Sequence, residues 1–224
     1  IGLRRSKDET IVRMPFEVRH MGSKYPIFSF DFTGAKRGVL PASYDYLRLE
    51  GRMQYRLNLP PIGYSQLMLE GGKIFGKVPY LLLKLHEGNG TYFYDRYAFS
   101  CMNFYEFSSD AWISFFYEHH FNGFLLGRVP LLKKLNWREV FVFKGVYGTL
   151  SARNDGSLPN TKAVMLFPVG MSSVEHPYLE TGFGIENIFR LLRVDCIWRL
   201  THHRAVPGLS IPTFTVNFSL NLKF

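Results

Sequence analysis

Apolar and polar residues alternate along most of this chain, and most regularly over its last twelve positions. Between Thr213 and Phe224 every second residue is apolar, and the residues between them are polar. A period of two places the apolar side chains on one face of an extended strand and the polar side chains on the other. Because the same alternation recurs in many shorter segments, the sequence predicts an all-β protein whose strands each have one apolar face.

The alternation predicts ten strands, at 10–20, 26–34, 45–59, 63–76, 97–107, 110–124, 138–150, 177–187, 193–203 and 213–224. Pro15 interrupts the first segment and predicts an edge or bulged strand there. The pair Pro60-Pro61 predicts a turn. The segment 45–59 has a polar residue at nearly every second position, which suits a strand lining an enclosed, polar interior.

These features predict a transmembrane, antiparallel, up-and-down β-barrel. Each strand of such a barrel needs about 9–11 residues, with lipid on one face and the interior on the other. We expect the apolar residues of the last strand to be the signal that the barrel-assembly machinery reads: Phe218, Leu220, Leu222 and Phe224. The chain begins with Ile1 and not Met, so we expect residues 1–224 to be one unit, the C-terminal segment of a larger barrel domain.

Composition agrees with a barrel and argues against a helical membrane protein. Aromatic residues make up 17% of the chain, yet the mean hydropathy is −0.05, and no apolar run reaches the 18 residues of a spanning helix. The formal net charge is +9, but Lys and Arg alternate with apolar residues and form no runs, so we expect no nucleic-acid partner. The two cysteines lie far apart without motif spacing, and we expect no metal or cofactor.

One face of the predicted strands carries charges that we expect to point into the barrel. They are Arg48, Glu50, Arg52 and Arg56 on one strand, and Arg193, Asp195 and Arg199 on a later one. Polar groups inside a barrel must be paired or hydrated. Two interpretations stay open: a ladder of structural ion pairs that fills the interior, or a positive constriction that favours anionic solutes.

A short repeat predicts docking elements at one end of the barrel. Residues 76–85 resemble residues 127–135, and 187–193 is a looser copy; each follows a strand and predicts a short amphipathic helical turn. Two predicted strands separate successive copies, so parity places all three turns at the periplasmic end. The residues expected to contact the periplasmic leaflet or a partner protein are Pro79, Leu82, Leu85, Pro130, Leu132 and Leu135.

No complete catalytic or metal site is visible in the sequence. His119 and His120 are adjacent on a strand and therefore point to opposite faces, which prevents them from binding one metal ion as neighbours. His202 and His203 are interpreted in the same way. Glu118 and His120 share a face and are expected to lie within hydrogen-bonding reach, but no third group completes a triad. We therefore predict a protein that is not an enzyme.

Several segments also resemble a family of outer-membrane proteins of the Bacteroidota. They include YEHHFNG at 117–123, VPLLKKLNWRE at 129–139, GIENI at 184–188 and WRL at 198–200. The family is named only as a domain of unknown function, and its members carry a carboxypeptidase-like regulatory domain, a β-sandwich and not a peptidase, ahead of the barrel. The resemblance covers residues 99–224.

The resemblance implies an outer-membrane location, contact with outer-membrane lipids including lipopolysaccharide, and a role in envelope assembly or surface export. Other outer-membrane proteins or lipoproteins would then be partners. We accordingly expect an anchor or accessory subunit. The alternatives are a solute-conducting porin with a positive interior, a hydrolase embedded in a barrel, and a soluble β-sandwich.

Overall fold

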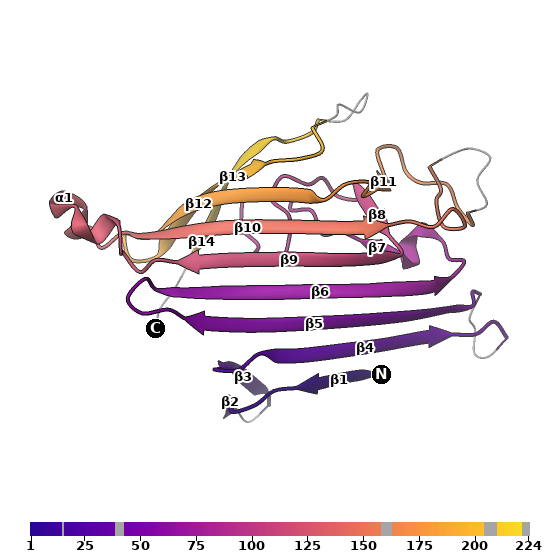
Figure 1. Ribbon diagram of the computed structural model, residues 1–224, viewed down its shortest axis with the longest axis horizontal. Helices are drawn as coiled ribbons and strands as arrows, with labels where there is room; N and C mark the ends of the chain where they lie inside the picture. The colour runs from indigo at the N-terminus through magenta and orange to yellow at the C-terminus, as the bar shows by residue number, and fades with distance from the viewer. Residues whose placement is uncertain (15, 39–42, 158–162, 204–209, 221–224) are drawn as a thin grey trace.

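The computed structural model describes residues 1–14, 16–38, 43–157, 163–203 and 210–220. The protein is all-β, and most of its strands form one large antiparallel sheet of nine strands (Figure 1). The strand order is β1-β4-β5-β6-β9-β10-β12-β13-β14, so the chain builds the sheet from one edge to the other. No pairing joins β1 to β14 in the described residues, and the sheet is open there where a closed barrel was predicted.

Eight of the ten predicted strands are confirmed. The large sheet comprises β1 (Gly2–Arg5), β4 (Ile27–Ala35), β5 (Tyr46–Asn58), β6 (Tyr64–Gly76), β9 (Ala111–His120), β10 (Arg138–Thr149), β12 (Tyr178–Ile188), β13 (Leu192–Arg199) and β14 (Phe214–Leu220). A separate hairpin contains β2 (Glu9–Arg13) and β3 (Val18–Ser23), and a small sheet contains β7 (Lys84–Leu85), β8 (Phe107–Ser109) and β11 (Ser172–Ser173). The helical turns are η1 (Tyr80–Leu82), η2 (Leu126–Arg128) and α1 (Pro130–Lys133).

The two faces of the large sheet differ sharply in chemistry. On the outer face, defined by Phe30, Ile113, Phe183 and Trp198, large apolar side chains are exposed: Phe183 is 59% exposed and Trp198 is 41% exposed. Within the eight long strands β4–β14, the only Asp, Glu, Lys or Arg residues on this face are Lys73 and Glu139. The opposite, inner face bears the remaining charges of these strands, and most of them are buried.

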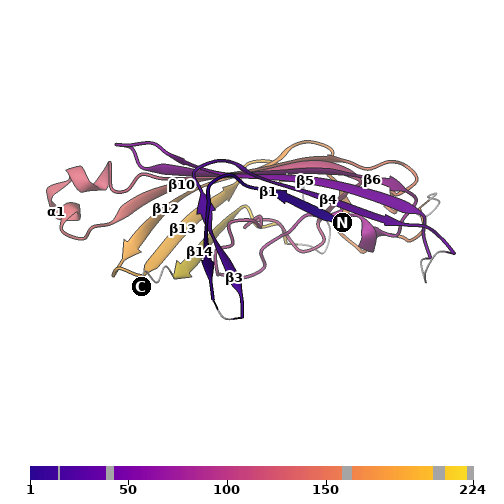
Figure 2. The same cartoon turned by 90° about the horizontal axis from the view of Figure 1, so that it is seen from below.

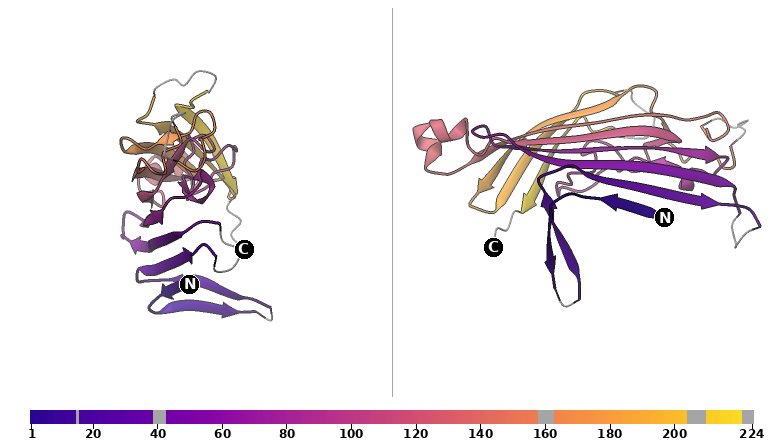
Figure 3. Two further views of the ribbon diagram at one scale, coloured as in Figure 1. Left: turned by 90° about the vertical axis from the view of Figure 1, so that its right-hand side faces the viewer. Right: turned by 60° about the horizontal axis from the view of Figure 1, so that its bottom comes forward.

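The inner face is covered by chain that leaves the sheet after β6 and returns at β9. We call residues 86–106 the crossing segment. The strands β12–β14 curl toward the side on which it lies (Figures 2 and 3). Phe99 and Met102 of this segment are buried in a cluster with Phe116, Val146 and Tyr178 of the sheet. The hydrophobic core therefore lies between the crossing segment and the inner face.

The last strand is also tied to the crossing segment through its backbone. The N–H of Tyr94 donates to the carbonyl of Phe218, and the N–H of Phe218 donates to the carbonyl of Tyr92, both at 2.7 Å. These bonds occupy part of the edge of β14 that faces away from β13. Phe218 and Leu220 themselves lie on the outer face and are exposed; Leu222 and Phe224 lie outside the described residues.

The connections are shorter on average at one end of the sheet, which we call the short end, although its connection 121–137 is longer than two of those at the opposite end. The end at which β5, β9, β12 and β14 finish has the connections 59–63, 121–137 and 189–191. The opposite end has 36–45, 77–110, 150–177 and 200–213. The predicted turn at Pro60-Pro61 lies at the short end, where the N–H of Leu59 donates to the carbonyl of Gly63 at 2.8 Å. Gly63 has φ of +106°, and a Cβ there would lie 1.8 Å from the carbonyl oxygen of His120, so only glycine fits.

Two strand predictions are wrong. The segment 10–20 is not one bulged strand: β2 ends at Arg13, and β3 begins at Val18 and pairs with β2 antiparallel. Position 15 lies outside the described residues. The segment 97–107 lies almost entirely in the crossing segment and forms no strand before Phe107. There the backbone N–H groups of Ser100 and Cys101 donate to the carboxylate of Glu180 instead of to a neighbouring strand.

The prediction that all three copies of the repeat share one end is also wrong. Because 97–107 adds no strand to the large sheet, β9 is the one strand of that sheet between 76–85 and 127–135, so these two copies lie at opposite ends. The third copy, 187–193, lies with 127–135 at the short end, and it forms a tight turn with no helix. Pro79 is buried and Leu82 and Leu85 are partly buried, whereas Pro130 and Leu135 are exposed and Leu132 is partly buried. Among the described residues no helix is long and apolar enough to cross a lipid bilayer.

Candidate functional site

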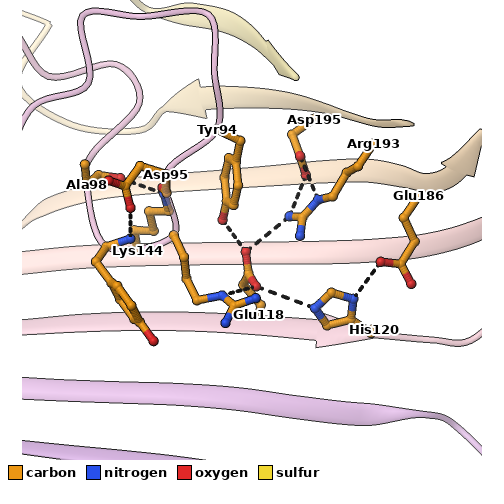
Figure 4. A network of polar contacts seen from close by, with 11 residues as sticks. Tyr94, Asp95, Ala98, Glu118, His120, Lys144, Glu186, Arg193 and Asp195 are labelled. Carbon is orange, nitrogen blue, oxygen red and sulfur yellow. Dashed lines mark hydrogen bonds and ion pairs between the residues drawn. The ribbon is translucent and has the colours of Figure 1, made fainter. Parts of the chain in front are cut away.

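A buried carboxylate, Glu118 on β9, is the centre of a polar network on the inner face (Figure 4). Its Oε1 accepts a hydrogen bond from the hydroxyl of Tyr94, and its Oε2 lies 2.7 Å from Nε of Arg96. Both partners belong to the crossing segment. Arg193 of β13 approaches the same carboxylate at 3.2 Å. One side chain of the sheet thus holds two residues of the crossing segment and one of a distant strand.

The network continues through β13 and β12. Arg193 donates two hydrogen bonds to Asp195, at 2.7 and 2.8 Å, because residues two apart on a strand share a face. His120 lies 3.5 Å from Glu118 and 3.1 Å from Glu186, so it bridges two carboxylates. The predicted shared face of Glu118 and His120 is confirmed. Figure 4 shows these groups converging below Tyr94.

Lys144 on β10 fixes the crossing segment in another way. Its ammonium is fully buried and donates to the backbone carbonyls of Asp95, at 2.7 Å, and Ala98, at 2.6 Å. It also lies 4.4 Å from the centroid of the Tyr94 ring. A buried cation is stable only when such acceptors replace its water shell, so Lys144 and this stretch of backbone require each other.

A second cluster of polar contacts holds the next part of the crossing segment. Glu180 of β12 accepts hydrogen bonds from the N–H groups of Ser100, at 2.8 Å, and Cys101, at 2.7 Å. Arg199 of β13 pairs with Glu106 at 2.6 Å and also donates to the carbonyl of Cys101 at 3.2 Å. Both sheet residues are buried. The segment is therefore anchored along its length and not only at its ends.

A third cluster lies where the chain enters the crossing segment. Glu70 of β6 is paired with Arg52 of β5, at 2.6 Å, and with Lys84 of β7, at 2.7 Å. His86 follows two residues later, with Nε2 2.9 Å from the hydroxyl of Ser109. Burial, together with the positive charge of Lys84, lowers the pKa of His86 to about 3. The imidazole is therefore neutral at physiological pH.

Tyr94 is held as a hydrogen-bond donor. Desolvation of its hydroxyl raises the pKa of Tyr94 well above the usual range, and the negative charge of Glu118 acts in the same direction. The phenol remains protonated and can keep donating to Glu118. The network has the features of a permanent polar clamp, since Glu118, Arg96, Arg193, Asp195 and His120 are paired with one another.

The register places all seven charged residues predicted for the interior on the inner face. Most are paired: Arg48 with Glu50 at 2.7 Å, Arg52 with Glu70, Arg193 with Asp195 and Arg199 with Glu106. Arg56 contacts no carboxylate in the described part of the chain, and its guanidinium lies 4.1 Å from the centroid of the Tyr64 ring. The two charged strands are not brought into contact with each other, because β6, β9, β10 and β12 lie between them.

Sequence reasoning missed most of the anchoring residues. Lys144, Glu70 and Glu106 were not singled out, nor were Tyr94 and Arg96 in a segment without strand pattern. The signal available was the same alternation: Glu118, Lys144 and Glu180 are charges at polar positions of three strands. The pattern does not indicate which groups these charges bind, because their partners in the crossing segment lie about 20 to 80 residues away along the chain.

A serine–histidine pair lies on the outer face near the short end. Oγ of Ser65 is 2.8 Å from Nδ1 of His119, and Nε2 of His119 is 3.0 Å from the carbonyl of Ile62. Both side chains are buried, and a backbone carbonyl occupies the position that an acid takes in a triad. Within the described residues there is also no group of three His, Cys, Asp or Glu side chains arranged to hold a metal ion.

The fold and this site define a class of protein: a curled antiparallel sheet with an apolar exposed outer face, whose charged inner face is clamped to a segment of its own chain. The chain belongs to the family of unknown function DUF5686, because the model of the DUF5686 C-terminal domain matches residues 8–152. The matched range includes the crossing segment and ends before β12. It differs from the range 99–224 over which the sequence motifs resemble an outer-membrane family. No curated protein matches the chain.

Proposed function

We propose that the large sheet is part of the wall of a transmembrane β-barrel in the outer membrane of a member of the Bacteroidota. The observation that carries this proposal is the contrast between the two faces. Exposed Phe, Leu, Ile and Trp side chains cover the outer face, where the long strands place only Lys73 and Glu139 as charged groups. In water such a face would be an unusually large apolar patch, whereas against lipid it is the expected surface.

The dimensions of the strands support the same proposal. β5 and β6 have 13 residues each, β10 has 12 and β12 has 11, enough to cross the hydrocarbon layer at a tilt. Barrels of this kind have short periplasmic turns and longer outer loops. The end with connections 59–63, 121–137 and 189–191 would then face the periplasm. Tyr44 and Trp137, aromatic residues of the kind that forms belts at the two membrane surfaces, precede strands that start at opposite ends of the sheet.

Within this barrel the protein would act as an anchor or accessory subunit of machinery that assembles or exports envelope proteins, and not as an enzyme. The crossing segment favours an anchor over a porin, since it fills the concave side of the sheet and is tied down by Glu118, Lys144 and Glu180. The barrel-assembly machinery, outer-membrane lipids including lipopolysaccharide, and other envelope proteins or lipoproteins would be its partners.

Planar-bilayer recording of the full-length protein tests the anchor against the porin. We expect no steady large conductance from the wild type, and steady channels after residues 89–105 are replaced by a short Gly-Ser linker. Large steady channels from the wild type would contradict the anchor. Membrane fractions tested in parallel should retain the protein after carbonate extraction; release into the aqueous fraction would contradict the barrel itself. Detergent pull-down with identification of co-purifying envelope proteins then tests the partners.

A further inference from the structure

Arg56 differs from the other arginines that the strands place on the inner face. Arg52, Arg193 and Arg199 each lie within 2.6 to 2.7 Å of a carboxylate, and Arg48 is paired with Glu50. Arg56 has no such partner among the described residues. It stacks on Tyr64, which leaves the edge of its guanidinium available. That edge is suited to an oxyanion, because it presents two parallel N–H donors to a carboxylate or phosphate.

The guanidinium of Arg56 lines a cavity of about 730 Å³ on the inner side of the sheet. The cavity is bounded by the hairpin β2–β3, by β5 and β6, and by the crossing segment, and its polar or aromatic lining includes Lys24, Gln54, Arg56, Gln66, Arg96 and Tyr97. The hairpin extends toward the same side as the crossing segment (Figure 3). Cavities of this size hold small organic molecules.

The balance of charge in this cavity is positive. Arg96 is neutralised by Glu118, at 2.7 Å. Lys24 and Arg56 have no ion-pair partner in the part of the chain that the structure describes, and Asp8 is the carboxylate that lines the same space. Two cations against one carboxylate leave an excess of one positive charge. A small anion would remove that excess and gain hydrogen bonds from the guanidinium.

A second feature points to a ligand that also carries hydroxyl groups. Gln54 and Gln66 line the cavity and bring amide groups, which can donate to or accept from the hydroxyls of a ligand. Tyr25 and Tyr97 line the same space and present flat apolar ring surfaces, on which the carbon face of a sugar would pack.

We propose that this cavity binds a small hydroxylated organic anion, such as a sugar phosphate or sugar acid, with Arg56 contacting the anionic group and the amide of Gln66 hydrogen-bonding to a hydroxyl. The site adjoins the polar clamp around Glu118 through Arg96, which lines the cavity and is paired with Glu118. It depends on the inner face and the hairpin, not on what covers the outer face, so its failure would leave the membrane proposal standing.

Isothermal titration of the full-length protein in detergent tests the site, with glucose 6-phosphate and gluconate as probes and glucose as the neutral comparison. We expect saturable binding of at least one anionic probe and at least tenfold weaker binding of glucose. Arg56→Gln should weaken binding of the anion at least tenfold, and Arg56→Lys should weaken it less. Lys73→Gln, which removes a cation from the opposite face, should bind like the wild type.

Two results would overturn the site: no binding of either anionic probe to the wild type, or unchanged affinity in Arg56→Gln. Because Arg56 is exposed and makes no ion pair, the variant is expected to fold. An unfolding curve for each variant, recorded in the same detergent, checks this directly. If Arg56→Gln unfolds like the wild type and loses affinity for the anion while Lys73→Gln does not, the anion contact is assigned to Arg56.

Discussion

The guanidinium of Arg193 lies 3.2 Å from the carboxylate of Glu118, although 75 positions separate the two residues in the chain. The contact joins β13 to β9 across the two strands between them, and Tyr94 and Arg96 of the crossing segment bind the same carboxylate. The curl of the sheet and the position of the crossing segment are therefore fixed by the same group.

Glu118→Gln should be strongly destabilising. The substitution leaves Arg96 and Arg193 with one negative charge fewer in a buried site, and breaking a buried ion pair by removing one partner costs about 3–5 kcal/mol. Urea unfolding in detergent micelles, followed by tryptophan fluorescence, measures the change. The control is Glu87→Gln, because the Glu87 side chain is 59% exposed and should contribute at most about 1 kcal/mol. Equal unfolding midpoints for the two variants would contradict the central role of Glu118.

His86 should make the protein less stable in mild acid. Its folded pKa is about 3, against about 6.5 in an unfolded chain. Between these values the unfolded state binds a proton that the folded state excludes, so stability falls as the pH drops below about 6.5. His86→Gln should therefore lose less stability between pH 7.5 and pH 4.5 than the wild type. Unfolding midpoints are measured for both proteins at both pH values. The carboxylates are common to both proteins, so their contribution to the loss of stability cancels in the comparison. An equal loss of stability in the wild type and in His86→Gln would disprove the role of His86.

Phe183→Arg tests what the outer face contacts. Phe183 lies in the middle of β12 and is 59% exposed. On a lipid-facing surface an arginine near the bilayer midplane costs about 2–4 kcal/mol, whereas on a water-exposed surface most substitutions stay within about 0.5 kcal/mol. Unfolding from phospholipid vesicles measures the cost, with Val169→Arg in the 150–177 connection as the control. If Phe183→Arg costs no more than Phe183→Ala, the outer face does not contact lipid.

The period-two pattern was sufficient to predict eight strands of the large sheet, because the face to which each strand residue points depends only on its position in the alternating sequence. The strand with charges at Arg48, Glu50 and Arg52 is the clearest case, and its extent is correct to within a residue or so at each end. The pattern failed where backbone groups find partners outside a sheet. Ser100 and Cys101 lie within the segment 97–107 that was predicted as a strand, but their N–H groups bind Glu180, and nothing local in the sequence indicates that acceptor.

The charged inner face was predicted as a set, but its pairings were not. Arg193 and Asp195 are two residues apart on one strand, so their contact follows from the pattern. Arg199 binds Glu106, which is 93 positions away, and Arg52 binds Glu70 across a strand pair whose register the sequence leaves open. Missing the crossing segment also misplaced the first copy of the helical repeat. The ends were assigned by counting strands back from the last one, so one falsely predicted strand moves every earlier connection to the opposite end of the sheet.

The fluorescence of Trp198 tests the membrane proposal most directly. Trp198 lies on the outer face of β13, whereas Trp112 is buried beneath the inner face. A protein retaining only Trp198, through Trp112→Phe and Trp137→Phe, is reconstituted into vesicles containing brominated phospholipids, beside a matched protein retaining only Trp112. We predict strong quenching of Trp198 by the brominated lipid, little quenching by aqueous iodide, and weak lipid quenching of Trp112. Quenching of Trp198 by iodide and not by the lipid would contradict the assignment of this face to the bilayer.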